Sequence, residues 1–214
     1  MTTWSSGVRS SRYANSHVQR RLKRALDITG CIVGIALLWP VILLTAIVTR
    51  VGSRGPTMFN SIRVGRNGVP FRMYKFRTMV ANAEELLPGL QSRNRGGKFL
   101  IKIPDDPRIT RVGRFLRRSS LDELPQLLNV LKGDMSLVGP RPQYPGEVEE
   151  YSAEQRRRLE MPPGISGLWQ ISARDSADFN DWVRFDLDYI DRWSALLDVQ
   201  ILVRTVAAVL RGLR

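Results

Sequence analysis

Histidine and cysteine are almost absent from this chain of 214 residues, which contains only His17 and Cys31. A single cysteine allows no intramolecular disulfide, so the fold is not a disulfide-stapled secreted domain. One histidine and one cysteine cannot supply the ligands of an ordinary zinc site. A Ser-His-Asp or Cys-His catalyst would need His17, which lies in a polar, basic stretch. Any chemistry therefore rests on carboxylates, cations, hydroxyls, backbone amides or a hard metal ion.

Acidic residues are scarce in residues 1–83, where Asp27 is the single acid against thirteen Lys and Arg. Residues 84–214 hold 20 basic and 19 acidic residues, so nearly all of the formal net charge of +13 lies in the first part. A basic, membrane-associated nucleic-acid-binding protein is the alternative that a sequence pI of 10.9 suggests. We expect no nucleic acid partner, because the basic residues flank one apolar segment rather than form a separate face.

Charged residues are missing altogether from residues 28–49, ITGCIVGIALLWPVILLTAIVT. A straight helix of this length would reach roughly 33 Å, enough to cross the hydrocarbon core of a bilayer. Pro40 lies near the middle and would kink such a helix. Lys and Arg flank both ends, and basic flanks prefer the cytoplasmic side. The sequence predicts a re-entrant membrane segment over residues 18–50, helix-break-helix at Pro40, with both ends cytoplasmic.

The rest of the chain predicts an α+β, mainly helical fold in one domain. We expect a disordered basic tail over residues 1–17 and a cytoplasmic domain over residues 51–214. Residues 57–79 alternate apolar and polar side chains around Arg66-Asn67-Gly68, which predicts a small β-hairpin. Residues 196–213 predict an amphipathic helix, which fits core packing and an interfacial membrane helix equally well.

Two adjacent carboxylates, Asp122 and Glu123, follow Arg117 and Arg118. Ser120 and Glu123 fit a capping box, which predicts a helix starting at Ser120 and ending at Gly133. The helix N-terminus and the arginines should favour ionised carboxylates. An ionised carboxylate can attack phosphorus, and a pair of acids can hold a hard divalent cation. By spacing alone, capping and salt bridges account for these residues better than catalysis does.

Three further sets of residues could bind an anionic substrate. Arg141 lies between two prolines, which fixes the backbone around a planar phosphate binder. Lys75 and Arg77 share one face of a strand, where a solvated face is the simpler interpretation. Gln170 ends the glycine-rich stretch 163–170, a weak motif that suits a ring or a phosphate.

Four stretches of the chain resemble the bacterial sugar transferase family, monotopic phosphoglycosyl transferases. They are KFRTM (75–79), DDPRITRVGRFLRRSSLDELPQLLNVLKGDMSLVGPRP (105–142), PGISGLWQISAR (163–174) and FDLDYIDRWSALLDVQIL (185–202). The similarity covers about residues 20–214 in the family's order. The chain resembles the minimal form, without the transmembrane bundle found ahead of this domain in longer members. Many members have Ser-Pro at the helix break, whereas this chain has Trp39-Pro40, so a hydroxyl that could satisfy a freed carbonyl is missing.

The resemblance implies transfer of a sugar 1-phosphate from a UDP-sugar to a polyprenyl phosphate, with release of UMP. It implies a ping-pong mechanism in which Asp122 forms a covalent phosphosugar and Glu123 assists with Mg²⁺ or the polyprenyl phosphate, so that Asp122 and Glu123 are the candidate metal ligands. Arg117 and Arg141 would hold phosphates, with Lys75, Arg77 and Gln170 as further substrate contacts.

The resemblance also sets the expected partners and place in the cell. We expect a bacterial inner membrane protein whose catalytic domain, residues 51–214, faces the cytoplasm and contacts anionic lipid. The GLWQ segment favours a hexose such as galactose or glucose, used in the first membrane step of exopolysaccharide synthesis. A homodimer stays open, because the sequence does not fix the oligomeric state. A catalytically inactive scaffold is a second alternative, against which the intact Asp122-Glu123 pair speaks.

Overall fold

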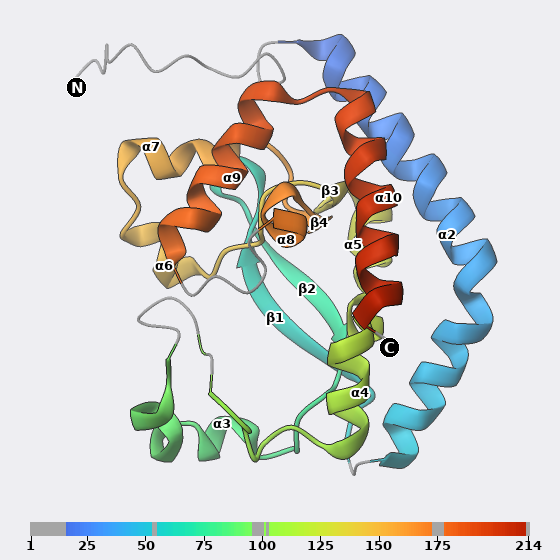
Figure 1. Cartoon of the computed structure of the whole chain (residues 1–214), viewed down its shortest axis with the longest axis vertical. Coiled ribbons are helices and arrows are strands. Elements are labelled where there is room, and N and C mark those ends of the chain that lie inside the picture. The colour runs from blue at the N-terminus through green and yellow to red at the C-terminus, as the bar shows by residue number, and fades with distance from the viewer. Residues whose placement is uncertain (1–15, 53–54, 96–100, 102, 173–177, 213–214) are drawn as a thin grey trace.

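The computed structural model describes residues 16–52, 55–95, 101, 103–172 and 178–212. Helices dominate, and a long N-terminal helix curves along one side of the molecule (Figure 1). The helices are α2 His17–Gly52, α3 Ala83–Leu86, α4 Arg111–Ser119, α5 Gln126–Lys132, α6 Pro145–Glu149, α7 Ala153–Arg156, α8 Leu168–Ser172, α9 Phe179–Arg192 and α10 Ala195–Gly212. The 3-10 turns are η1 Arg66–Gly68, η2 Pro88–Arg93, η3 Leu121–Glu123 and η4 Arg157–Glu160, and the strands are β1 Met58–Val64, β2 Pro70–Phe76, β3 Ser136–Val138 and β4 Gly164–Ser166.

The predicted hairpin is confirmed, with β1 antiparallel to β2 and Met58 opposite Phe76. Asn67 (φ 58°) and Gly68 (φ 79°) both adopt the left-handed backbone that the Asn-Gly pair predicts. Phe71 and Met73 on one face of β2 are buried among side chains of α2 and α5. The hairpin is therefore attached to α2 and to α5, the helix that follows the acidic pair in the chain.

The strands β3 and β4 form a short parallel pair, which the sequence did not predict. Each strand has three residues, too few for a periodic pattern to be recognised. Gly139 and Gly164 lie so close that a Cβ atom on Gly164 would overlap the backbone of Gly139. This close approach fixes the start of the Pro140–Pro142 loop beside the start of the 163–170 stretch.

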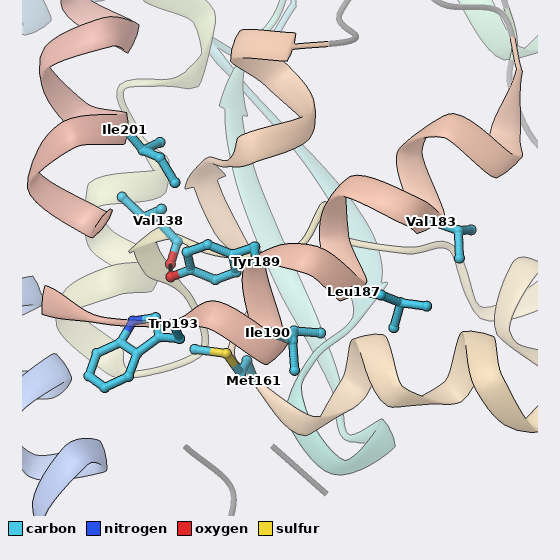
Figure 2. Close-up of a cluster of buried hydrophobic side chains, with 8 residues drawn as sticks. All are labelled: Val138, Met161, Val183, Leu187, Tyr189, Ile190, Trp193 and Ile201. Carbon is cyan, nitrogen blue, oxygen red and sulfur yellow. Dashed lines mark hydrogen bonds between the residues drawn. The ribbon is translucent and has the colours of Figure 1, made fainter. Parts of the chain in front are cut away.

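Two clusters of buried apolar side chains form most of the interior. In the first, α9 and the start of α10 pack on β3, and Figure 2 shows Tyr189 with its hydroxyl toward Val138. That hydroxyl lies 3.0 Å from the carbonyl oxygen of Val138. The second cluster joins α2, β2 and α5 around Cys31 and Val130, both fully buried.

The long helix α2 has an inverted polarity, because the side that faces the protein contains buried polar side chains and the exposed side carries most of its large apolar side chains. Its buried polar residues are Lys23, Asp27, Thr45 and Thr49. Its exposed large apolar residues are Val18, Leu22, Ile32, Val33, Leu37, Leu38, Trp39, Leu43, Leu44, Ile47, Val48 and Val51. Within the described part of the chain, α2 is the helix long and apolar enough to cross a membrane. An apolar outer surface of this extent marks a membrane or interaction surface.

Helical geometry continues through Pro40, and Figure 1 shows α2 curving along its length. The helix begins at His17 and ends at Gly52, close to the predicted limits of 18–50. Proline removes one backbone hydrogen bond and is an established cause of helix bending. The re-entrant course through a membrane stays a prediction. Residues 1–15 of the predicted tail lie outside the described residues.

Buried polar contacts hold α2 on the rest of the protein. The Lys23 ammonium donates to the Asp198 carboxylate of α10 at 2.7 Å, and both residues are buried. The carboxylate of Asp27 accepts hydrogen bonds from Ser136 Oγ at 2.8 Å and from the backbone N–H of Leu137 at 3.0 Å. Removing one partner of either contact would cost free energy, because a buried charge or hydrogen-bond donor would be left without a partner.

The predicted C-terminal helix is confirmed as α10, and one of its sides packs on the core, whereas its location at a membrane interface stays a prediction. Asp198 and Ile201 are buried against α2 and β3. A second stripe on the same helix is exposed and apolar, and consists of Leu196, Val199, Val203 and Val206. The helix thus packs on the core with one side and offers an apolar surface with another.

Asn129 generates a stability prediction, because its fully buried amide joins the hairpin to α5. It donates to Arg72 O at 2.7 Å and accepts from the N–H of Tyr74 at 3.0 Å. We expect Asn129→Ala to lower the free energy of unfolding by about 2 kcal/mol or more, since backbone groups lose their partner. Leu128→Ala, at the exposed neighbouring position, is the control and should change it by much less. Equal denaturation midpoints for the two variants would contradict this assignment.

Candidate active site

Asp122 and Glu123 lie in the single turn η3, which joins α4 to α5. The prediction of one helix starting with a Ser120–Glu123 capping box is wrong. Ser120 has a left-handed backbone (φ 57°) and makes no side-chain capping bond, and α5 begins only at Gln126. Pro125 lacks an N–H and takes the N-cap position of α5, where none is required. The two carboxylates therefore project from a sharp turn and not from a regular helix.

Asp122 is buried, with 7% of its surface exposed. Burial and the nearby charge of Glu123 raise the pKa of Asp122 to about 6, against the opposing effects of Lys75 and Arg117. The expectation that a helix N-terminus and the arginines favour the ionised form is corrected, since desolvation outweighs them. At pH 7 this carboxylate is mainly ionised but poorly hydrated, which suits a nucleophile.

Glu123 forms an ion pair with Lys75 on β2, whose Nζ lies 2.7 Å from Oε1. Both side chains are about a quarter exposed. Nearby, the Arg117 Nε donates to Thr78 Oγ1 at 2.9 Å, and the guanidinium is within electrostatic range of Asp122. The structure thus brings Lys75 and Arg117 to the acidic pair, and their contacts with substrate stay predictions.

Arg77 directly follows β2, and its side chain packs near the end of α2. It is buried against Gly55, where a Cβ atom would overlap its Nη1. Gly55 has φ 118°, a backbone that glycine adopts without strain. This packing favours a structural role for Arg77, so its predicted contact with substrate stays a prediction.

Arg141 follows β3 in the loop before α6. Its backbone N–H donates to the Asp186 carboxylate at 3.3 Å, and its guanidinium carbon lies 4.7 Å from the centre of the Trp182 ring. The Nη1 atom is buried and has no hydrogen-bond partner among the described residues. A guanidinium with unused donors in this position is suited to binding an anion.

A buried ion pair between Arg158 and Asp186 supports the Arg141 loop. Arg158 donates two hydrogen bonds to one oxygen of Asp186, from Nε at 2.9 Å and from Nη2 at 2.6 Å. The third nitrogen, Nη1, donates to the hydroxyl of Tyr151 at 2.7 Å. Because Asp186 also accepts the N–H of Arg141, the pair holds the loop in one position.

Gln170 lies on α8, next to Trp169, whose ring centre is 5.6 Å from that of Trp182. Trp182 in turn lies against the guanidinium of Arg141. The Gln170 Oε1 and Trp169 Nε1 atoms are buried without a partner among the described residues. Gln170 is therefore linked to the site through the Arg141 side and not through the acidic pair.

Sequence reasoning missed Arg63 and Tyr144, which lie between the two predicted sets. The guanidinium carbon of Arg63 is 3.2 Å from the centre of the Tyr144 ring. Arg63 is within electrostatic range of Glu123 and Arg141, and Tyr144 is within that range of Arg117. The period of two in β1 and the hairpin register put Arg63 on the face that also presents Lys75, which was the available signal. Tyr144 had no signal in the sequence.

Asp122 and Glu123 are the residues that could hold a metal ion at this site. The described residues contain no cluster of three or more His, Cys, Asp or Glu side chains. Two carboxylates fit Mg²⁺, which commonly binds one or two protein carboxylates and completes its shell with water and substrate phosphates. The donor chemistry therefore suits the predicted ion.

Residues 18–212 match the sequence model of the bacterial sugar transferase family. The chain is 48% identical over 192 residues to the galactosyl transferase CpsE of Streptococcus agalactiae, covering 89% of this chain and 42% of that protein. It is 45% identical over 197 residues to the undecaprenyl-phosphate galactose phosphotransferase of Salmonella typhimurium, covering 90% and 41%. The exopolysaccharide production protein ExoY of Sinorhizobium fredii is 39% identical over 191 residues, covering 87% of this chain and 84% of that protein.

The chain thus spans about two fifths of the first two relatives and most of the third. The match includes the acidic pair, the Arg141 loop and α8, so the residues that the structure gathers lie within the shared region. The resemblance read from the sequence motifs is confirmed. This chain belongs to the bacterial sugar transferase family.

Proposed function

We propose that this chain transfers a sugar 1-phosphate from a UDP-sugar to a polyprenyl phosphate and releases UMP. The observation that supports it most directly is the buried Asp122 carboxylate beside Glu123, Lys75 and Arg117. Two relatives are named for galactose transfer, one of them onto undecaprenyl phosphate, which favours galactose as the sugar and undecaprenyl phosphate as the acceptor.

In the first step, an oxygen of Asp122 attacks the phosphorus that bears the sugar. A P–O bond forms to Asp122, and the P–O bond to the UMP oxygen breaks, so UMP leaves with the electron pair. The Arg117 and Arg141 guanidiniums neutralise the diphosphate. Without this neutralisation, the Asp122 carboxylate and the diphosphate would repel each other. Burial removes part of the hydration shell of the Asp122 carboxylate before the attack.

In the second step, a phosphate oxygen of the polyprenyl phosphate attacks the same phosphorus. The bond to Asp122 breaks, which restores the carboxylate and leaves the sugar on a polyprenyl diphosphate. Two steps allow a water-soluble donor and a lipid acceptor to use one site in turn. Mg²⁺ held by Asp122 and Glu123 would supply further neutralisation of the phosphate charge. Lys75 then holds Glu123 in place beside Asp122.

The outward apolar surfaces of α2 and α10 support a site at the membrane. We propose that α2 enters and leaves the bilayer on the cytoplasmic side and that the catalytic domain stays there, at the bacterial inner membrane. Basic residues before and after α2 favour this orientation. Lys23 and Asp27 are buried against the rest of the protein, so these two charges of α2 would not face lipid. A homodimer stays a prediction.

Asp122→Asn tests the nucleophile. UMP release from UDP-galactose in the presence of undecaprenyl phosphate should fall by about 10³-fold or more, because an amide does not displace UMP. Thermal stability should not fall at pH 7, since the amide avoids the cost of burying a charge. Glu149→Gln, an exposed position, is the charge-matched control and should keep activity. Full turnover by the Asp122 variant would end the proposal.

The raised pKa of Asp122 predicts the pH profile. Below about pH 6 the carboxylate is protonated and cannot attack, so kcat/KM should fall with an apparent pKa of about 6. Lys75→Met should move this acid limb to higher pH, because the Lys75 charge lowers the pKa of Asp122. The limb is measured from initial rates of UMP release between pH 5 and pH 8. A limb that stays in place in the variant would contradict the electrostatic assignment.

The proposed orientation of α2 is tested by cysteine labelling in intact cells. Asn15→Cys and Asn60→Cys place thiols on either side of the helix, and the native Cys31 is buried. A membrane-impermeant maleimide added from outside should label neither position, and both should react after permeabilisation. Labelling of one position only from outside would show a helix that crosses the bilayer and would overturn the re-entrant course.

A further inference from the structure

Arg63 is a buried cation that no proposed catalytic step uses. It is 7% exposed, and burial lowers the pKa of its guanidinium to about 10. Its Nε donates to Ser61 Oγ at 3.2 Å and its Nη1 to Pro142 O at 3.2 Å. No carboxylate among the described residues forms an ion pair with it. Burying a charge without an ion-pair partner costs free energy, so other contacts must stabilise the Arg63 guanidinium.

Stacking supplies part of the compensation. The Arg63 guanidinium lies over the Tyr144 ring, with its carbon 3.2 Å from the ring centre. An aromatic face stabilises a cation and leaves its N–H donors free to point sideways. One of those donors reaches Pro142, which follows Arg141 directly. Arg63 is thus attached both to the loop that presents Arg141 and to a ring two residues further along.

The same loop is held at three other points. Val64 N donates to Gln143 O at 2.9 Å, and the side chain of Gln143 donates to Arg141 O. From the opposite side, the carboxylate of Asp186 accepts the N–H of Arg141. β1 therefore holds one edge of the loop and α9 the other, while the Nη1 of Arg141 keeps no partner among the described residues.

We infer that Arg63 is a positioning residue, which fixes the Pro140–Pro142 loop so that Arg141 can bind a phosphate of the nucleoside diphosphate sugar. The inference rests on the proposed function for its substrate. Arg63 acts through the backbone of Pro142 and through Tyr144, and its own burial keeps it from the phosphate. Its charge adds to the positive potential around Arg141 without competing for the ligand.

A double-mutant cycle in UDP binding separates this role from direct contact. Calorimetric titration of the full chain with UDP gives Kd for wild type, Arg63→Met, Arg141→Ala and the double variant. Arg63→Met keeps the stem volume but removes the donors. We expect each single variant to weaken UDP about tenfold or more, and the double variant to be no weaker than Arg141→Ala. Additive losses would overturn the inference and indicate direct contact of Arg63 with phosphate, and unchanged binding in Arg63→Met would also overturn it.

Two further variants protect the test against a folding defect. Tyr144→Leu leaves the charge and removes the stacking face at an exposed position, and it should weaken UDP in the same direction by a smaller factor. Arg72→Met, at an exposed position of the same hairpin, is the matched control and should bind UDP as wild type does. If Tyr144→Leu and Arg72→Met both bind like wild type, the stacking part of the inference is overturned.

Turnover provides a readout that a general loss of structure would not give. In UMP release, Arg63→Met should raise KM for the UDP-sugar about tenfold and change kcat much less, because Asp122 and Glu123 are untouched. A fall in kcat of about tenfold with an unchanged KM would overturn the positioning role. A wild-type chain that binds UDP but releases no UMP from any UDP-sugar would refute the proposed function and leave the binding cycle interpretable.

Discussion

The inverted polarity of α2 is the constraint on which the other parts of this structure depend. Its buried polar residues face the rest of the protein, where Lys23 contacts Asp198, and Asp27 contacts Ser136 and the backbone of Leu137. These partners belong to α10 and β3. On the same side of the helix, Cys31 packs over α5. The acidic pair precedes α5 and the Arg141 loop follows β3, so the helix with the apolar outer surface also holds the two halves of the candidate site.

Charge compensation decides how the site itself is built. Asp186 pairs with Arg158 and Glu123 with Lys75, whereas Asp122, Arg63 and Arg141 form no such ion pairs among the described residues. Desolvation then raises the pKa of Asp122 and lowers that of Arg63. The site therefore contains a poorly hydrated carboxylate near the charges of Lys75 and Arg117, and a buried Nη1 atom of Arg141 that has no partner among the described residues. These cationic groups can stabilise a bound anion, and phosphoryl transfer requires such stabilisation of phosphate charge.

The fold and the site were predictable from the sequence to different extents. The hairpin followed from alternation around Asn67-Gly68, and α10 from its apolar stripe, because both signals are local. The acidic pair was found, yet its backbone was not, since the left-handed Ser120 overrides a sequence that fits a capping box. The pKa of Asp122 was predicted in the wrong direction, because burial is a property of the packed structure. Arg63 was missed because its one signal, the hairpin register, puts it on the face of Lys75 but does not show that it is buried or what it contacts.

The sequence by itself determined the apolar N-terminal helix, the hairpin, the acidic pair, the Arg141 loop and the family, since each depends on residues close together in the chain. Only the tertiary structure decided which side of α2 faces the protein, that Asp122 is buried, and that Arg63 contacts Tyr144 and the Arg141 loop. These features depend on contacts between residues far apart in sequence, such as Lys23 with Asp198 and Arg63 with Pro142. Desolvation and pairing of charges arise from those contacts, and the order of residues along the chain does not state them.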